Sequence, residues 1–346
     1  MSRAAATAPL VRKSRPRKSG PAAPVGSAAA ASATDGLTPD ALGSNAPAAS
    51  VRFGKKELSF SNLNKVLYKE SGFTKRDVLR YYLGVAHAIL PHLKGRTLTL
   101  KRYPDGSEGF FFYEKSCPSH RPPWLDTAHV TSRRKEGFID YCVVNDAAAL
   151  AWVANLASLE LHTSLAKARA ITRPTMMVFD LDPGPPAGMI DCCRVALRMR
   201  DVLLGVGLQS FPKTSGGKGL HFYVPLNTPC TFDQTKSFAH TLALAFENDD
   251  PTRIVSSMKK DLRHNKVLID WSQNDEHKTT VCAYSLRARV RPTVSTPVTW
   301  KEVEDALKAG DPDRLIFEAG DVVERVRRVG DLFEPLNTLK QRLPAG

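Results

Sequence analysis

Two aspartates separated by one residue end an apolar run near the middle of this chain. Asp180 and Asp182 follow residues 175–179, whose composition is typical of a buried strand. Because side chains alternate along a strand, both carboxylates face the same side, with Cα atoms roughly 6 to 7 Å apart. Paired divalent ions fit between such groups, so the motif indicates a metal site. The alternative is a pair of exposed acids at a strand end, before the turn at 183–186.

The charge of the chain indicates a polyanionic partner. The 346 residues include 49 Lys and Arg and 35 Asp and Glu, a formal net charge of +14. Residues 1–50 hold six basic and two acidic side chains, so most of the excess lies in residues 51–346. This distribution favours nucleic acid or an anionic membrane surface as the partner. No apolar run reaches the roughly 20 residues that span a bilayer, so we expect no membrane insertion.

Composition divides the chain near residue 50. Residues 1–50 are rich in Ala, Pro, Ser and Gly and have few large apolar side chains, which predicts a disordered basic tail. An organellar transit peptide is an alternative, although its prolines would interrupt the required helix. Residues 51–346 are expected to form one folded domain. The six cysteines show no C-x-x-C pair and no zinc spacing, so we expect buried thiols in a reducing compartment.

Strand-like and helix-like segments alternate without a regular period, which predicts an α+β fold. Thr74 is expected to cap the first helix, and Pro91 to help end it. Further helices are expected at residues 145–156, 192–204, 232–246 and 300–326, the last broken by a loop at 310–313. Strands are expected at residues 58–60, 98–103, 110–113, 175–179, 208–211, 220–224 and 267–271.

A glycine-rich loop, 214–219, leads directly into the strand that begins at Leu220. Its backbone N–H groups, the Ser215 hydroxyl and the Lys218 ammonium suit a polyphosphate. His221, at the start of the strand, could donate to a phosphate oxygen. The loop is not a P-loop, because the Walker pattern leads into a helix. The alternative is a flexible hairpin loop followed by a structural histidine.

A third carboxylate, Asp270, also ends an apolar run. A buried charge without a partner is very costly, so this side chain needs a cation. It is either a third metal ligand beside Asp180 and Asp182, or the ion-pair partner of an arginine such as Arg263 or Arg287.

Basic and aromatic residues lie together at 101–103, 110–115 and 259–263. Proteins that bind single-stranded nucleic acid combine such charge with stacking rings, although the run 110–112 is also typical of a core. Because successive rings on a strand face opposite ways, at most alternate members of that run can contact DNA.

Together these motifs resemble the polymerase domain of bacterial DNA ligase D, a member of the archaeo-eukaryotic primase superfamily. The resemblance runs from about Leu58 to Phe333. It is carried by residues 180–184, 215–221 and 269–274, and further by 64–68, 101–106 and 278–289. It implies that residues 51–346 form a primase-polymerase catalytic domain. The implied fold is an RRM-like core of mixed or antiparallel sheet with flanking helices and an N-terminal α/β module.

The resemblance also implies an activity. It implies a nucleotidyltransferase with a two-metal mechanism that uses Mn²⁺ or Mg²⁺. Template-directed addition of NTPs or dNTPs, preferably ribonucleotides, would occur at DNA gaps or ends in short-gap filling, excision repair or end joining. The partners would be gapped or end DNA with a 5′-phosphate, a DNA ligase and an end-binding protein, in the bacterial cytoplasm at the nucleoid. We expect no ligase or nuclease domain here, as in stand-alone mycobacterial paralogues.

Roles for single residues follow from the same resemblance. The catalytic residues and metal ligands would be Asp180, Asp182 and Asp270. The nucleotide would be bound by Lys101, His162, Ser215, Lys218, His221, Arg263 and Arg287, with His162 near the sugar. DNA would be bound by Asn62, Lys65 and Lys75 at the 5′-phosphate and by Phe112 and Tyr113 at the template. The family often has two phenylalanines at the last two positions, so Tyr113 is a departure.

Two other functions stay open at this point. A non-catalytic module that bridges DNA ends could use the acids merely to hold the fold together. A metal-dependent nuclease could use similar acids, but it would have no reason to bind a triphosphate.

Overall fold

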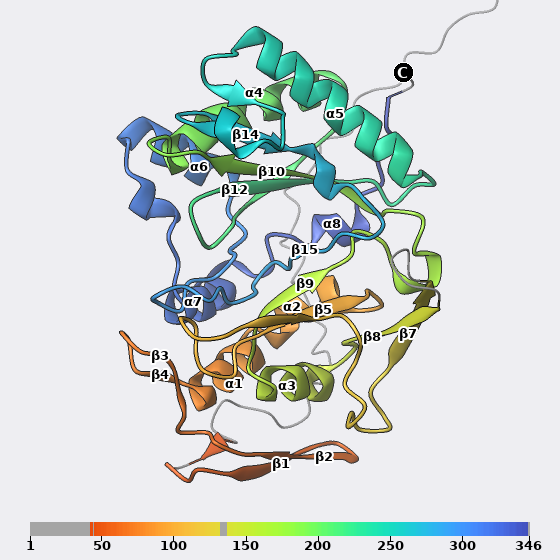
Figure 1. The fold of residues 1–346 in the computed structure, drawn as a ribbon, viewed down its shortest axis with the longest axis vertical. Coiled ribbons are helices and arrows are strands. Elements are labelled where there is room, and N and C mark those ends of the chain that lie inside the picture. The colour runs from red at the N-terminus through yellow and green to blue at the C-terminus, as the bar shows by residue number, and fades with distance from the viewer. Residues whose placement is uncertain (1–41, 44, 132–136, 345–346) are drawn as a thin grey trace, which may run out of the picture. The chain divides into compact units, whose positions relative to one another are not determined.

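Two β-sheets organise the protein in the computed structural model, which describes residues 42–43, 45–131 and 137–344 (Figure 1). One sheet has five strands in the order β11-β12-β10-β14-β13. The other has six, in the order β15-β9-β5-β8-β7 with β6 also paired to β5. Strands β13 and β14 run parallel, and the other described pairs in these sheets are antiparallel. The predicted α+β class, with mixed and antiparallel sheet and flanking helices, is confirmed.

The five-stranded sheet carries three helices on one face (Figure 1). Its strands are β10 (Met176–Pro183), β11 (Phe211–Thr214), β12 (Leu220–Pro225), β13 (Ile254–Val255) and β14 (Val267–Asp270). Its helices are α4 (Met189–Gly205), α5 (Phe232–Asp249) and α6 (Trp300–Ala309).

Alternation along β10 separates two hydrophobic cores. Phe179 and Leu181 are fully buried among residues of α4, such as Met199. Val178 belongs instead to the core of the six-stranded sheet. Because residues i and i+2 share a face, Asp180 lies on the face of Val178, away from the helices.

The six-stranded sheet packs against the N-terminal helices, with a small hairpin beyond them (Figure 1). Its strands are β5 (Leu98–Arg102), β6 (Phe112–Glu114), β7 (Thr127–Thr131), β8 (Phe138–Cys142), β9 (Ser158–Thr163) and β15 (Thr280–Val281). The helices are α1 (Lys75–Gly84), α2 (Ala86–Leu93) and α3 (Ala147–Asn155). The remaining elements are β1 (Ala49–Phe53), β2 (Lys56–Phe60), β3 (Val66–Tyr68), β4 (Phe73–Thr74), α7 (Ala319–Val329) and α8 (Pro335–Thr338).

The first predicted helix is two helices in the structure. Thr74 caps α1 as expected, and it forms a capping box with Asp77. The helix ends at Gly84, and α2 continues from Ala86 through Pro91. The proline does not end α2, because Lys94 N–H still donates to Leu90 O at 2.8 Å beyond it. Pro91 removes only its own donor from this last turn.

Most of the predicted N-terminal tail lies outside the described residues. Within it, Ala49 and Ser50 already belong to β1, two residues before the predicted boundary. The disorder of residues 1–50 therefore stays a prediction. Among the helices described, none combines the length and apolar character needed to cross a bilayer.

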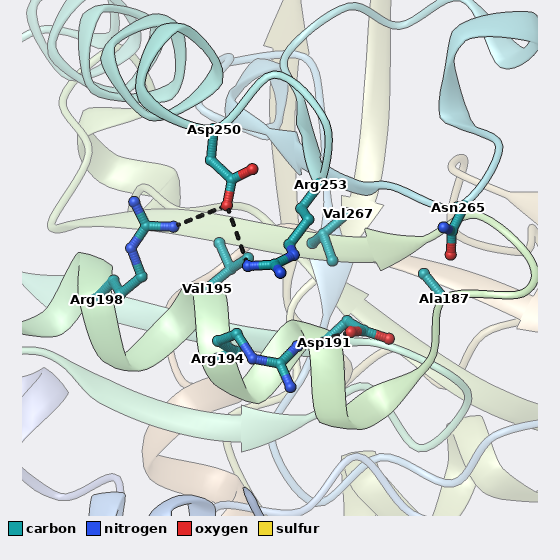
Figure 2. Close-up of a pocket in the computed structure, with 9 residues that line it drawn as sticks. All are labelled: Ala187, Asp191, Arg194, Val195, Arg198, Asp250, Arg253, Asn265 and Val267. Carbon is teal, nitrogen blue, oxygen red and sulfur yellow. Dashed lines mark hydrogen bonds and ion pairs between the residues drawn. The ribbon is translucent and has the colours of Figure 1, made fainter.

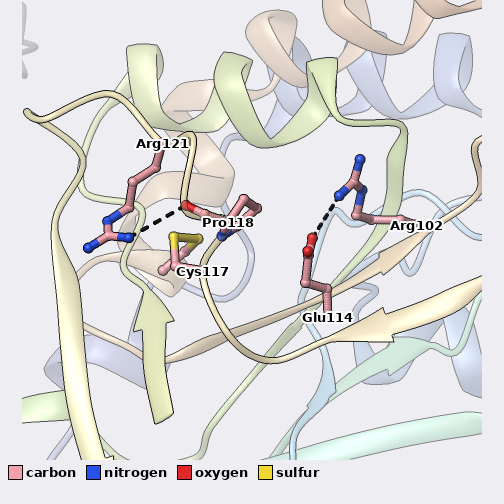
Figure 3. Close-up of a disulfide and its surroundings, with 6 residues drawn as sticks. Arg102, Glu114, Cys117, Pro118 and Arg121 are labelled. Carbon is pink, nitrogen blue, oxygen red and sulfur yellow. Dashed lines mark hydrogen bonds and ion pairs between the residues drawn. A yellow bond between two sulfur atoms is a disulfide. The ribbon is translucent and has the colours of Figure 1, made fainter.

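The expectation of six free thiols is wrong for two cysteines. Cys117 and Cys142 form a disulfide (Figure 3). Cys117 follows β6, and its N–H donates to Asp140 O of β8 at 2.6 Å, so the backbone already holds it beside Cys142. A spacing of 25 residues carries no local motif, because the tertiary fold sets this pairing. The other four cysteines are free thiols, three of them buried and Cys230 only half-buried.

Candidate active site

Three aspartates lie on adjacent strands of the five-stranded sheet. Asp180 of β10 is in register with Asp270 at the end of β14. Asp182 lies two residues further along β10, on the same face as Asp180. The structure thus brings together two acids that are separated by 90 positions in the chain.

The charges of these three acids act on one another. Partial loss of hydration, followed by the negative charges of Asp180 and Asp270, raises the pKa of the exposed Asp182 to about 6. Although burial opposes its ionisation, the neighbouring His221 lowers the pKa of Asp180. The Oδ1 atom of Asp180 lies 3.0 Å from His221 Nε2, yet it accepts no well-aligned hydrogen bond from the described residues.

Asp270 is held by its own loop, and the described arginines do not pair with it. It accepts hydrogen bonds from Ser272 N at 3.0 Å, Ser272 Oγ at 2.5 Å and Gln273 Nε2 at 2.7 Å. The two arginines that were alternative partners have other contacts. Arg287 Nε lies 3.4 Å from Glu160, and Arg263 donates to a backbone carbonyl.

The acids fit a hard divalent cation in their donor chemistry. Asp180 and Asp182 supply neighbouring carboxylates, one Oδ atom of Asp180 has unused acceptor capacity, and a cation would relieve the repulsion that raises the pKa of Asp182. The side-chain positions do not themselves form a coordination sphere: in the described ranges, no group of three His, Cys, Asp or Glu is arranged to hold a metal ion.

Asp180 and Asp182 open onto a cleft of about 410 Å³, a volume in the range of small-molecule sites. The lining includes eight of the predicted site residues: Tyr113, His162, Asp180, Asp182, Ser215, Lys218, His221 and Arg287. Both sheets contribute to this lining, because His162 lies on β9 and His221 on β12. Lys101, Arg263 and Asp270 are not part of it.

The glycine loop between β11 and β12 forms one wall of the cleft. Ser215 Oγ accepts hydrogen bonds from the N–H groups of Gly217 and Gly219, both at 3.1 Å. A Cβ on Gly219 would lie 2.3 Å from Leu181 O, so only glycine allows the loop to pack on β10. Two N–H groups expected to face a polyphosphate therefore stabilise the loop itself, and the Lys218 side chain remains on the cleft lining.

Sequence reasoning missed Glu160, which contacts three of the residues predicted at the nucleotide site. Its side chain is buried on β9, with carboxylate oxygens 3.6 Å from Lys101 Nζ, 3.0 Å from His162 Nε2 and 3.4 Å from Arg287 Nε. Although burial opposes its ionisation, His162 and Arg287 hold the pKa of Glu160 well below its usual value. A local signal existed, because Glu160 precedes His162 by two positions and shares its face of the strand.

Sequence reasoning also missed Lys213, which is fully buried behind the cleft on β11. Its Nζ lies 2.6 Å from Ser295 Oγ and 3.2 Å from His221 Nδ1. Burial, and then the charge of Arg287, lowers the pKa of Lys213 to about 7. No motif marked this residue, because the predicted strand ended at Phe211 and Ser295 is 82 positions away.

The two aromatic residues expected at the template face opposite sides of β6. The ring of Tyr113 lies on the cleft side, with its centroid 6.0 Å from that of His162. Phe112 stacks on Phe110 at 5.9 Å and lies 5.2 Å from the Arg102 guanidinium. Because successive side chains on a strand face opposite sides, Phe112 and Tyr113 have different surroundings.

The residues expected at the 5′-phosphate form a group apart from the cleft lining. Lys65 N–H donates to Asn62 O at 2.9 Å, and Lys75 N–H donates to Lys65 O at 2.8 Å. Burial, and then the charges of Lys65 and Arg102, lowers the pKa of Lys75 to about 8. Lys65 Nζ lies 3.7 Å from Asp105. Lysine charges gathered in this way suit an anion.

A second charged cavity, of about 90 Å³, lies against α4 and contains none of the predicted site residues (Figure 2). Asp250 lies between two of its arginines, 3.4 Å from Arg198 and 3.8 Å from Arg253. Arg194 pairs with Asp191 at 2.8 Å. Because these arginines already have carboxylate partners, this cavity is a weaker anion site than the cleft.

Known proteins share both the sequence and the fold. The family model for the LigD primase-polymerase domain matches residues 74–333. The chain is 40% identical over 294 residues to the multifunctional non-homologous end joining DNA repair protein LigD of Mycobacterium tuberculosis, covering 82% of this chain and 37% of that protein. It is 29% identical over 297 residues to the bifunctional non-homologous end joining protein LigD of Bacillus subtilis, covering 83% and 47%. This chain therefore spans less than half the length of either relative.

A solved structure is similar over nearly its whole length. It is the polymerase domain from Mycobacterium tuberculosis Ligase D in complex with DNA, with a TM-score of 0.76 and 38% sequence identity. The match covers 82% of this chain and 99% of that chain.

Proposed function

The chain belongs to the LigD primase-polymerase family, and from this premise we propose that it is a template-dependent nucleotidyltransferase. It adds nucleotides, preferably ribonucleotides, at gaps or ends of DNA during repair. The observation that carries the proposal is the pairing of Asp180 with Asp270 beside a cleft whose other wall is cationic. The net charge of +14 and the DNA complex of the solved relative support a nucleic-acid partner.

Asp180, Asp182 and Asp270 would hold the divalent cations, Mn²⁺ or Mg²⁺, that the reaction requires. When bound, such ions act as Lewis acids that activate the primer hydroxyl and neutralise the triphosphate. The chain's own contribution is a fixed set of carboxylates on a rigid sheet. Asp270 is kept in place by Ser272 and Gln273, so little reorganisation is needed.

Residues of the cleft orient the nucleotide. Lys218, His221 and Arg287 face the triphosphate, where fixed cations and hydrogen-bond donors stabilise developing negative charge. His162 lies near the sugar. Tyr113 offers a stacking surface to a base, an interaction of about 1–3 kcal/mol.

DNA binds across a wider surface than the nucleotide. Asn62, Lys65 and Lys75 bind the 5′-phosphate of the downstream strand, and Phe112 contacts the template. A DNA ligase and an end-binding protein are the expected partners, in the bacterial cytoplasm at the nucleoid.

Loss of an aspartate tests the catalytic assignment. Asp180→Ala or Asp270→Ala should abolish primer extension on gapped DNA, because the remaining carboxylates cannot hold the cations in place. DNA affinity should change little, since these acids contact no DNA backbone. Asp233→Ala, an exposed change on α5, is the matched control and should behave as wild type. Extension by either active-site variant above a few per cent of wild type would reject the assignment.

The 5′-phosphate site is testable separately. Lys65→Ala should weaken binding to a gap that bears a 5′-phosphate more than binding to the same gap without it. Lys55→Ala, which also removes an exposed lysine, should affect both gaps alike. Equal losses for Lys65→Ala would indicate a general backbone contact, for which the salt slope falls by about one.

The rival functions predict different products. A nuclease shortens the labelled strand without added nucleotide, and an end-bridging module leaves the strand unchanged. Incorporation of labelled ribonucleotide with Mn²⁺ on a gapped template is expected only from a polymerase.

A further inference from the structure

Glu160 stands just behind the cleft and contacts five groups without lining the cleft itself. Its side chain is only 2% exposed. Oε1 accepts hydrogen bonds from Tyr103 OH and Ala288 N, both at 3.2 Å, and lies 3.6 Å from Lys101 Nζ. Oε2 lies 3.0 Å from His162 Nε2 and 3.4 Å from Arg287 Nε. Of these partners, His162 and Arg287 line the cleft, whereas Lys101, Tyr103 and Ala288 do not.

The partners of Glu160 come from three separate segments. Lys101 is its cross-strand neighbour on β5, and His162 is on β9 itself. Arg287 and Ala288 lie on the segment that follows β15, 128 positions from Glu160 in the case of Ala288. One carboxylate therefore links two strands and a distant loop.

Lys101 and Arg287 each have a second contact besides Glu160. Lys101 Nζ lies over three rings, 4.5 Å from the centroid of Phe111, 5.2 Å from Tyr103 and 5.4 Å from Tyr113. Such rings attract a cation without fixing its direction. The Arg287 guanidinium also donates to Ser215 O, so Glu160 and the glycine loop hold the same arginine.

The charge of the Glu160 carboxylate and its positioning contacts should affect nucleotide binding in opposite directions. A buried anion beside the nucleotide site weakens the attraction for a triphosphate, so removing it should tighten binding if charge alone mattered. A buried anion with five partners fixes the groups around it, so removing it should weaken binding if position mattered. Lys101 and Arg287, both half-buried, would also repel each other without their shared partner.

We propose that Glu160 is the positioning residue of the nucleotide site: its buried carboxylate holds Lys101, His162 and Arg287 for the sugar and phosphates of the substrate and touches no substrate itself. The proposal rests on the proposed polymerase function. It adds a residue outside the cleft lining to the determinants of nucleotide affinity.

Glu160→Gln tests the proposal, because glutamine keeps the size of the side chain and removes its charge. At saturating gapped DNA, the KM for ribonucleotide should rise roughly tenfold or more, while kcat changes by less than about threefold. DNA affinity should stay at the wild-type value. Glu302→Gln is the matched control, since Glu302 pairs with Arg325 at 2.6 and 2.7 Å but lies outside the cleft lining. Its KM should equal that of wild type.

A second variant decides the matter if Glu160→Gln folds poorly. Glu160→Asp keeps the charge but withdraws it by one methylene, so it should also raise KM if position matters. An unchanged or lower KM in the folded variants, with wild-type enzyme active, would overturn the role of Glu160 alone. Wild-type protein that neither extends primers nor binds a fluorescent ribonucleotide would overturn the polymerase function as well.

Discussion

Lys213 has no carboxylate partner among the described residues, although it is fully buried. Its contacts are a hydroxyl and a ring nitrogen, Ser295 Oγ and His221 Nδ1. When Lys213 donates to Nδ1, the hydrogen of a neutral His221 ring resides on Nε2, the atom nearest Asp180. A buried lysine thereby sets which way the histidine of the cleft donates.

The lowered pKa of Lys213 has a consequence for stability. The unfolded chain keeps this proton up to the ordinary pKa of 10.5, whereas the folded chain loses it near a pKa of about 7. Between these values the unfolded state binds more protons, so stability rises with pH. Relative to Lys213→Met, the free energy of unfolding of wild type should rise by roughly 1 kcal/mol per pH unit across this window, measured by urea unfolding.

Lys301→Met serves as the control for this measurement. Lys301 is exposed and forms an ion pair within α6, to Asp305. Its stability difference from wild type should stay nearly constant with pH. A constant difference for Lys213→Met as well would contradict the lowered pKa.

Strand β10 shows how an element can be completed by a side chain. Its partner β14 ends at Asp270, opposite Asp180, so Val178 has no strand to pair with on the β14 side of β10. The buried amide of Asn274 replaces it. Val178 N–H donates to Asn274 Oδ1 at 2.9 Å, and Asn274 Nδ2 donates to Val178 O at 2.7 Å.

Removing this amide should destabilise the protein. Asn274→Ala leaves a buried N–H and a buried C=O of Val178 unpaired, which costs about 1–3 kcal/mol for each group. We expect a loss of roughly 2–4 kcal/mol in the free energy of unfolding, measured with urea. Asn64→Ala removes an exposed hydrogen bond to Asn45 O and one from Arg76, whose guanidinium keeps two backbone acceptors, so it should cost less. A loss of under about 0.5 kcal/mol for Asn274→Ala would show that water replaces the amide.

Local sequence predicted elements where local chemistry decides them. Thr74 caps α1 through its own hydroxyl, and the acids of β10 and β14 follow apolar runs, so each could be read from neighbouring residues. The strand expected at 208–211 begins at Phe211, because Leu208 is buried beside α4 and its N–H donates to Leu203 O. An apolar run alone does not separate a strand from a turn that packs on a helix.

At the scale of the whole molecule, the disulfide between Cys117 and Cys142 reduces the number of conformations open to the unfolded chain. It closes a loop of 25 residues, for which the chain-entropy account gives about 3 kcal/mol of stabilisation. Reduction should lower the free energy of unfolding by about that amount. The variant with both Cys117→Ser and Cys142→Ser should resemble the reduced protein and be insensitive to reductant. Wild-type stability that does not respond to reductant would contradict the prediction.

The resemblance gave the fold and the expected site, whereas the sharing of one cleft by two sheets could not be read from local pattern. Glu160 meets Ala288 across 128 positions, and Lys213 meets Ser295 across 82. These contacts depend on how the segment after β14 returns past β15, which no motif encodes. Sequence therefore indicated the residues that line the cleft better than the residues that hold them in place.

The segment from Asp270 to Arg287 contributes to both sheets. Asp270 ends β14 of the five-stranded sheet, and Thr280 and Val281 form β15 of the six-stranded sheet. Arg287 then donates to the glycine loop. A nucleotide with its cations, held by Asp182 on one side and His162 on the other, would connect the two sheets. Substrate occupancy should then slow amide hydrogen exchange in β9 and β10 together, although these strands share no backbone ladder. The two sheets would then be rigidly connected only while a nucleotide is bound. How well each nucleotide fits the cleft would therefore determine how rigid the domain becomes.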